Sequence, residues 1–435
     1  MAVGAGPADE GADDELPGTR RRSAPSVFKR ALSIPDLRQS YGDPQVPIEE
    51  DWWELFFDLI FIGIADMLGE AVEVALEHPA PALVALTVLM TFVFALVWFD
   101  FTLYFNRFKV KNDLYTTSAL FLYALSVVLM SVSIEDLRYG LNYRFCLFAA
   151  ACQFSMVLIH LPICVRGSAR EKRFALLRVV LFAIAIGLWG ANAAQSTYIG
   201  QLVVTAVIIV YLFCVLFIVG DFGIRGRPLK FSLPYNVHHL CDRSYVLVLI
   251  FLGDIIVRLI RPPPYVMTWA HLAGLSLCFL ICLTIKQLGH DCAPRTLDEN
   301  ALYASRTTGA VFLCLHMLLP ITLVCLGVGF DEALQAIDGD TPSGKAVYLV
   351  TVSYVGVVVI FNAMRCLHQF QQRSTLVWIL RIVVVVVMTA ILLAFGDRLP
   401  VLGALGSISA VGSGLALVDR LGFDLPSHRN GLLST

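Results

Sequence analysis

Long apolar runs of about 20 residues recur along nearly the whole chain. Such a run can span a bilayer as an α-helix, because a helix satisfies its own backbone hydrogen bonds. The predicted spans are 52–73, 82–105, 115–133, 144–165, 174–193, 199–220, 237–257, 266–286, 304–328, 345–364, 376–395 and 400–418. The pattern predicts an all-α fold, a polytopic transmembrane helix bundle of about 12 spans.

The composition agrees with a membrane protein. The chain is 57% hydrophobic and 15% charged, whereas soluble domains carry about 25% charged residues. A net charge of −2 and the lack of a large basic patch argue against a nucleic-acid partner. Most of the eleven Cys lie inside apolar runs, which predicts packing rather than disulfides. Without a cleavable signal peptide, the first span is expected to direct insertion.

The two ends of the chain differ from the apolar region. Residues 1–50 are rich in Gly, Pro, Ser and charge, so they are predicted to form a disordered, basic cytoplasmic tail. Residues 51–422 are predicted to form the transmembrane domain, and residues 423–435 a short cytoplasmic tail.

Basic residues between the spans predict the orientation. If the N-terminal tail is cytoplasmic, alternate loops contain Arg107, Lys109, Lys111, Arg166, Arg170, Lys172, Arg173, Arg225, Arg227, Lys230, Arg295, Arg365 and Arg373. The opposite loops contain only Arg138, Arg258, Arg261, Lys345 and Arg398. Because Lys and Arg favour the cytoplasmic side, both termini are predicted to be cytoplasmic.

Two segments indicate an internal repeat. DLIFIGIADMLGE, from Asp58, aligns with DRSYVLVLIFLGD, from Asp242, and TTSALFL in the third span resembles TTGAVFL in the ninth. This predicts a parallel repeat with halves 51–231 and 232–422. In such folds the substrate site commonly lies between the repeats.

The first span contains four carboxylates, Glu54, Asp58, Asp66 and Glu70. Each costs about 2.5–3.5 kcal/mol at the centre of a bilayer, so the side chains should face the bundle and meet a cation or a proton. Glu54 and Asp58 share a helical face at i, i+4. Glu70 is expected near solvent at the outer end, and the depth of Asp66 has no explanation from the sequence.

The seventh span repeats this chemistry with His. In the repeat alignment His238 takes the place of Glu54, and Asp242 that of Asp58; His239 and Arg243 are also i, i+4. A polar pocket that faces the cytoplasm is therefore predicted between the halves. The candidate substrate or ion-binding residues are Glu54, Asp58, Arg107, His238, His239, Asp242, Arg243, Asp254 and His316.

Three interpretations of these residues stay open. They could relay a proton or cation, form ion pairs that only hold the helices together, or build an enzyme site with an acid/His pair or a metal. Glu54, His160, His238 and Asp242 are suitable metal ligands, but no HExxH or CxxC spacing occurs. His316 alone is more typical of a packed core His. No catalytic, nucleotide-binding or cofactor motif is present, so no catalytic residue, metal or cofactor is assigned.

Two serines in the N-terminal tail match a kinase-type pattern. Ser23 and Ser33 each follow an Arg by three residues and precede a Pro by two. Phosphorylation there could recruit a phosphoserine-reading adaptor protein. The alternative is a basic tail that only enforces orientation.

The quoted segments resemble the bacterial low temperature requirement A family, LtrA. WWELFFDLIFIGIADML resembles its Glu-Leu-Phe-Phe-Asp-Leu helix, WFDFTLYFNRFKVKNDLY its Trp…Asn-Arg-Phe-Asp stretch, and HHLCDRSYVLVLIFLGD its His-x-x-Glu-Arg-Phe…Leu-Gly-Glu helix. The resemblance covers most of residues 50–330. It carries over Glu54, Asp58, Trp98, Asn106, Arg107, His238 or His239, Asp242, Arg243, Gly253, Asp254 and His316.

The chain departs from the family pattern at several positions. Only Asp113 represents the acid pair after Arg-Phe, and Lys109 and Lys111 intervene. The eighth span ends in LTIKQLGHD, with Lys286 and Asp291, in place of a Trp-rich segment. These changes predict a divergent member whose substrate can differ from that of its relatives.

The combined interpretation is a multi-pass membrane protein that acts as a secondary transporter, for which coupling to protons is one expectation. A small solute or ion would bind at the cytoplasm-facing polar site. A membrane-embedded enzyme and a non-transporting scaffold or sensor are the alternatives. The sequence names neither the substrate, the oligomeric state nor the membrane.

Overall fold

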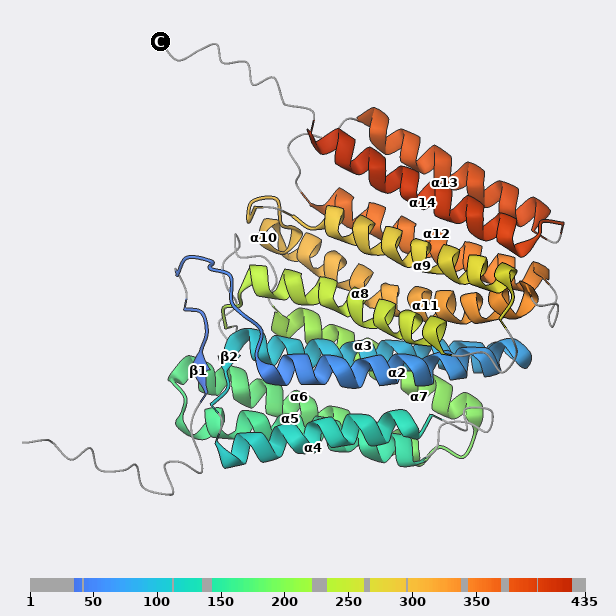
Figure 1. Ribbon diagram of the computed structural model, residues 1–435. Coiled ribbons are helices and arrows are strands. Elements are labelled where there is room, and N and C mark those ends of the chain that lie inside the picture. Colours follow the sequence, from blue (N-terminus) through green and yellow to red (C-terminus); the bar gives the residue numbers. More distant parts are fainter. Residues whose placement is uncertain are drawn as a thin grey trace, which may run out of the picture.

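The computed structural model of the protein describes residues 35–40, 43–111, 113–134, 143–220, 233–261, 267–294, 296–337, 343–368, 375–396 and 398–424. Within these residues the chain is almost entirely helical (Figure 1). The all-α, polytopic bundle predicted from the apolar runs is confirmed.

Each predicted span corresponds to one long helix. These helices are α2 (Trp52–Glu77), α3 (Pro81–Arg107), α4 (Leu114–Val132), α5 (Tyr143–Arg166), α6 (Ala169–Ala193), α7 (Tyr198–Gly220), α8 (Val237–Ile260), α9 (Trp269–Cys292), α11 (Arg306–Ile337), α12 (Ser343–Leu367), α13 (Thr375–Phe395) and α14 (Val401–Asp424). The described residues add three short elements, α10 (Ala301–Ala304), β1 (Asp36–Leu37) and β2 (Phe108–Lys109). Several helices extend beyond the predicted apolar core, α11 by nine residues at its C-terminal end.

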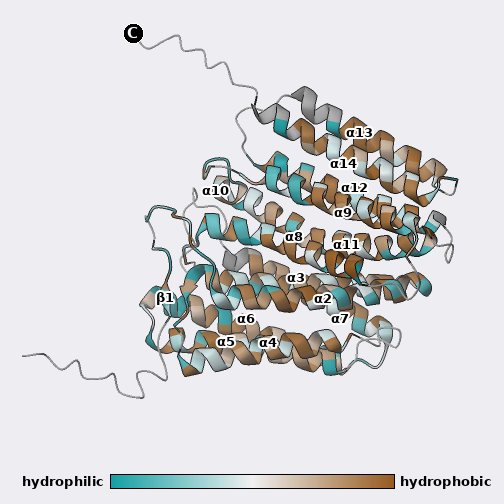
Figure 2. Ribbon diagram, in the orientation of Figure 1, coloured by the Kyte–Doolittle hydropathy of each residue, from teal (hydrophilic) through white to brown (hydrophobic). Residues whose placement is uncertain are grey.

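Nine helices in the described part of the chain are long and apolar enough to cross a membrane. The helices α2 and α8 are not among them, because carboxylates and guanidinium groups interrupt their apolar faces. Apolar residues dominate the lengths of the helices and hydrophilic ones gather towards their ends (Figure 2). The protein is therefore a multi-pass membrane protein, while its exact number of spans stays a prediction.

Four helices form the centre of the bundle. The helices α2, α3, α8 and α11 contact one another in every pairing. Figure 1 shows α4, α5 and α6 on one side of this centre and α9, α12, α13 and α14 on the other. The centre is thus the place where the first six long helices meet the last six.

The two halves of the chain have equivalent packing. In each half the first long helix contacts the second and third, the second contacts the sixth, and the third to sixth pack in chain order. This correspondence supports the predicted parallel repeat, which stays a prediction.

Local capping fixes the start of the two charged helices. Asp51 caps α2: its carboxylate accepts from the Trp53 N–H at 3.0 Å, and the Glu54 carboxylate accepts from the Asp51 N–H at 3.0 Å. Asn236 caps α8 by accepting from the His239 N–H at 2.9 Å. Such reciprocal caps satisfy backbone donors that the first helical turn leaves unpaired.

The structure differs from the prediction that residues 1–50 are one disordered tail. Residues 1–34 lie outside the described residues, as do Ser23 and Ser33. Residues 36–40 and 43–50, called the strap below, lie against the bundle: β1 pairs antiparallel with β2, and the Arg38 N–H donates to the Arg107 carbonyl at 2.8 Å. The polar composition did not predict an ordered strap, because hydrogen bonds rather than buried apolar side chains hold the strap in place.

Candidate functional site

Asp58 and Arg243 form a buried ion pair between α2 and α8. The Arg243 Nη1 and Nη2 atoms donate to the two oxygens of Asp58 at 2.6 and 2.7 Å. The Trp98 indole, from α3, donates to the same carboxylate at 3.2 Å, and its ring lies 5.2 Å from the Arg243 guanidinium carbon. A bidentate pair fixes both distance and orientation, so it determines how α2 and α8 meet.

Glu54 lies one turn away and approaches two cationic or protonatable groups. Its Oε1 atom is 3.4 Å from His239 Nε2 and 3.6 Å from Arg243 Nε. These three buried atoms face one another across these contacts and have no other hydrogen-bond partner in the described residues. Arg38 of the strap lies 3.9 Å from the other oxygen of Glu54.

The hydrogen bonds of Asn106 determine the tautomer of His239. The Asn236 N–H donates to Asn106 Oδ1 at 2.9 Å, which leaves the Asn106 amide to donate to the Asn236 carbonyl at 2.8 Å and to His239 Nδ1 at 3.1 Å. His239 Nδ1 therefore accepts, and the ring proton of the neutral imidazole sits on Nε2, facing Glu54.

These side chains form what is called the inner cluster: Glu54, Asp58, His239 and Arg243, with Trp98 and Asn106. Glu54, Arg243, Trp98 and Asn106 are 0% exposed, and His239 is 2% exposed. The two carboxylates, Glu54 and Asp58, face the guanidinium groups of Arg243 and Arg38. The cluster thus places its acids against guanidinium groups and is shielded from solvent.

The strap covers the inner cluster at the end of the bundle where α2 and α8 begin. The Asn236 amide donates to Gln39 Oε1 at 3.2 Å and to the Val46 carbonyl at 2.7 Å, and the Val237 N–H donates to Gln45 Oε1 at 2.9 Å. Asn236 therefore links Asn106 and His239 to the strap. The strap lies over the place where the sequence predicted a cytoplasm-facing pocket.

Removing the Gln39 side chain should release the strap. In Gln39→Ala, Asn236 loses an acceptor and the carbonyls of Asp43 and Pro44 lose a donor, so the strap amides should exchange with deuterium about tenfold or more faster. Hydrogen exchange with mass spectrometry at residues 36–39 measures this. Gln195→Ala, at the other end of the bundle, is the matched control; unchanged exchange in the Gln39 variant would show that the strap is held elsewhere.

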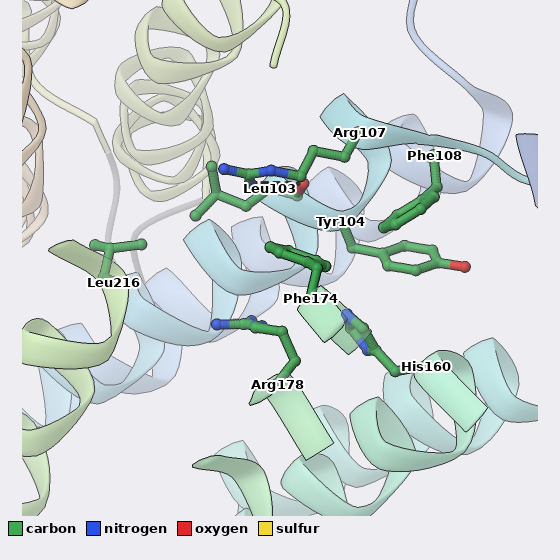
Figure 3. A pocket seen from close by; sticks show the side chains of 8 residues that line it. All are labelled: Leu103, Tyr104, Arg107, Phe108, His160, Phe174, Arg178 and Leu216. Carbon is green, nitrogen blue, oxygen red and sulfur yellow. Dashed lines mark hydrogen bonds between the residues drawn. The ribbon is translucent and has the colours of Figure 1, made fainter. Parts of the chain in front are cut away.

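Arg107 does not join the inner cluster. Its guanidinium donates to the Leu103 and Leu233 carbonyls at 3.4 and 3.5 Å and lies over the Phe174 ring at 5.4 Å. Figure 3 shows Arg107 across Phe174 from Arg178 and His160, around a small cavity. His160 accordingly lies apart from Glu54, His238 and Asp242, and no three His, Cys, Asp or Glu in the described ranges are placed to hold a metal.

Three other predicted residues also lie elsewhere. His238 and Asp242 point away from the inner cluster because each is one position from His239 or Arg243, about 100° around the helix. The carboxylate of Asp242 is exposed and lines a groove against α9. His316 is 0% exposed; its Nδ1 lies 2.9 Å from the Phe312 carbonyl and its ring 5.1 Å from that of Tyr245.

Asp254 belongs to a second ionic network, at the opposite end of the α2–α8 contact. Arg258 is the centre of this outer cluster, with carboxylate oxygens of Asp66, Glu73, Asp254 and Asp331 at 2.9, 3.0, 3.3 and 3.2 Å. Arg261 adds a second contact to Asp66 at 3.1 Å. Ion pairs between α2 and α8 thus occur at both ends, and α11 joins the outer one.

The outer cluster explains the depth of Asp66, and it needs two glycines. Asp66 contacts Arg258 of α8 and Arg261, the residue that follows α8. A Cβ at Gly69 would overlap the Arg258 guanidinium, and one at Gly327 would touch Ile255 and Arg258. Gly69 and Gly327 therefore let α2 and α11 approach the arginine closely.

A family model described as bacterial low temperature requirement A protein (LtrA) matches residues 51–417, from the N-cap of α2 into α14. The chain belongs to the LtrA family. No curated protein and no solved structure matches it.

Several residues that carry the LtrA resemblance lie close together in the structure. Of the positions that the resemblance carries over, six converge on the inner cluster, namely Glu54, Asp58, Trp98, Asn106, His239 and Arg243. Of the two His alternatives, the structure brings His239 to Glu54. The LtrA pattern did not mark Asn236, Arg38 or Gln39, although an Asn before an apolar helical run is an N-cap signal that the sequence contains.

Proposed function

We propose that this LtrA member is a secondary transporter whose coupling site is the inner cluster. The observation that carries the proposal is a buried network of facing charges between the first and seventh long helices. Ionisable side chains inside membrane proteins are costly and commonly belong to ion or proton pathways. In repeat-built transporters such sites lie between the halves.

His239 is the proton carrier in this proposal. Protonating its Nδ1 places two donors against each other, because the Asn106 amide already donates to that atom. The Asn106 amide would then have to turn, which breaks its pair of bonds to Asn236. Since Asn236 also holds the strap, uptake of a proton at His239 is linked to release of the strap.

Charge balance favours the same linkage. Glu54 faces the guanidinium groups of Arg38 and Arg243 and the His239 ring, and Asp242 lies on the neighbouring turn of α8. When the strap leaves, Arg38 leaves with it. A proton on His239 then replaces that positive charge beside Glu54, and the buried site stays neutral.

Access in this scheme alternates between the two ends of the α2–α8 contact. Release of the strap and loosening of Glu54–His239 would open the predicted cytoplasmic side. The outer cluster would close the opposite side while Arg258 keeps its carboxylates. Both termini are proposed to be cytoplasmic, as the distribution of Lys and Arg favours. The solute itself stays unnamed, as does the adaptor proposed to read Ser23 or Ser33.

The test is solute-dependent proton movement by the purified protein. Solutes are first screened by thermal shift between pH 5 and 8, where His titrates. Those that stabilise the protein are then added to proteoliposomes that contain a pH-sensitive dye. Wild type should move protons when a solute is added, and His239→Gln should lose the pH dependence while keeping its yield and melting temperature.

Two outcomes would contradict the transporter. If no solute causes proton movement in wild type, the inner cluster has no coupling role. If His239→Gln transports with an unchanged pH profile, the proton is carried elsewhere. His316→Gln is the matched control, because this buried His lies outside the cluster and its replacement should leave the pH dependence intact.

A further inference from the structure

A groove opens between α8 and α9 on the strap side of the bundle. It encloses about 230 Å³ and is lined by Asp242, Val246 and Leu249 of α8 and by Ile285, Lys286 and His290 of α9, among others. It can hold a small polar group but not a folded segment.

The groove contains opposite charges that do not pair with each other. Asp242 and Lys286 are exposed side chains on facing helices. Within the described residues, neither makes an ion pair or a side-chain hydrogen bond. Elsewhere the protein pairs such charges closely, as in Arg178–Asp100 at 2.6 Å. A carboxylate and an ammonium held apart in one groove leave room for a ligand that carries both charges.

The walls and position of the groove indicate where that ligand comes from. Below the charges, Val246, Leu249 and Ile285 form an apolar surface, and Leu249 is 50% exposed. Asp242 lies in the second turn of α8, and Lys286 lies two turns before the end of α9. Hydrophilic residues gather at these helix ends (Figure 2). The charges therefore lie at the level of lipid headgroups, with the apolar wall at the level of acyl chains.

We propose that the α8–α9 groove binds a phospholipid with a zwitterionic headgroup that carries a free ammonium, such as phosphatidylethanolamine. The phosphate pairs with Lys286, with His290 beside it, and the ammonium pairs with Asp242. An acyl chain lies along Val246, Leu249 and Ile285. The site is separate from the inner cluster, because Asp242 points away from Arg243 and Glu54, and it does not rest on the proposed transport activity.

Native mass spectrometry of the full-length protein in a non-ionic detergent tests the proposal. The probes are dioleoyl phosphatidylethanolamine and dioleoyl phosphatidylglycerol, which share acyl chains and phosphate; the first carries ethanolamine with its ammonium and the second an uncharged glycerol. Wild type should prefer the former by about two- to five-fold, the range expected for one partly exposed charge pair. Asp242→Asn should abolish the preference, whereas Lys286→Gln should weaken binding of both lipids.

The control is Arg166→Gln, an exposed cation at the end of α5, outside the groove; it should leave the preference unchanged. Because Asp242 and Lys286 are exposed, both variants should fold, and their melting temperatures check this. The proposal is overturned if wild type binds the two lipids equally, or if Asp242→Asn keeps the preference. It is also overturned if soluble glycerophosphoethanolamine displaces the lipid at equal concentration, since the headgroup alone would then account for binding.

Discussion

Arg243→Met should remove most of the folded protein, and Asp58→Leu in the same chain should restore it. The single change leaves the Asp58 carboxylate buried with only the Trp98 N–H as a partner, a defect of about 3–5 kcal/mol. The double change replaces the pair by apolar groups of similar size, which is often neutral or stabilising. Yield after detergent extraction and apparent melting temperature measure both effects.

The Asp58→Leu and Arg243→Met double variant also tests whether this ion pair only stabilises the bundle or takes part in transport as well. Arg178–Asp100, between α6 and α3, is a second buried pair at 2.6 Å and supplies the control. Arg178→Met with Asp100→Leu should recover both the fold and solute-dependent proton movement. Asp58→Leu with Arg243→Met should recover only the fold. If both double variants transport normally, the inner cluster is only a structural ion-pair network. That result would favour a scaffolding role over a coupling role for these residues.

The sequence predicted which helices meet but not which side chains of α8 face the site. The acids of the first span were expected to meet cations and His of the seventh, and Glu54 and Asp58 do so. The repeat alignment, however, matched them with His238 and Asp242, whereas His239 and Arg243 are in contact. An alignment of repeats identifies equivalent positions, and equivalent positions need not touch when two helices pack side by side.

The outer cluster as a whole was not predicted because Arg258, at its centre, lies just beyond the end of a predicted span. The seventh span was predicted to end at residue 257, which placed Arg258 and Arg261 in a loop. The helix α8 continues to Ile260, and Arg258 is only 6% exposed. Asp331 likewise lies beyond the predicted end of the ninth span, in the extension of α11. Hydropathy shows where a run of apolar residues ends. It does not show that a helix continues beyond that run when ion pairs stabilise its charged residues.

The strap shows a second limit of composition. Its Pro, Gln and charged residues are typical of disorder, yet Gln39 is 4% exposed and joins Asn236 through one amide. Backbone pairing with β2 supplies the rest of its order. A polar segment can be ordered when it forms hydrogen bonds with polar groups at helix ends. The sequence does not identify those groups, because they depend on how the helices pack.

Both charged clusters join the same two helices, and this arrangement gives the transport scheme its geometry. At the inner end the acids of α2 meet His239 and Arg243. At the outer end Asp66 and Glu73 of α2 meet Arg258. The helices α2 and α8 can separate at one end only if the ion pairs at that end break, while the ion pairs at the other end stay formed. In the proposed transport scheme, ion pairs at the two ends of one helix contact would let access alternate without a large hinge.

Gly69→Ala should be the most damaging single-methyl change in the outer cluster. The added Cβ would occupy the place of the Arg258 guanidinium, which would have to move off α2. A free side chain could move at little cost, but this one has four carboxylates around it. Displacing it leaves buried Asp254 without its partner, a loss of about 3 kcal/mol, read out as a lower apparent melting temperature.

Gly63→Ala, on the same helix, is the matched control. Apart from the adjacent residues and the nearby backbone of its own helix, no atom lies within 4 Å of the place where its Cβ would be. Ala stabilises a helix by about 0.5–1 kcal/mol relative to Gly. The control should therefore melt at or above the wild-type temperature. Equal melting of the two variants would show that Arg258 can leave α2 freely. The outer ion pairs would then be too weak to hold that end of the α2–α8 contact closed.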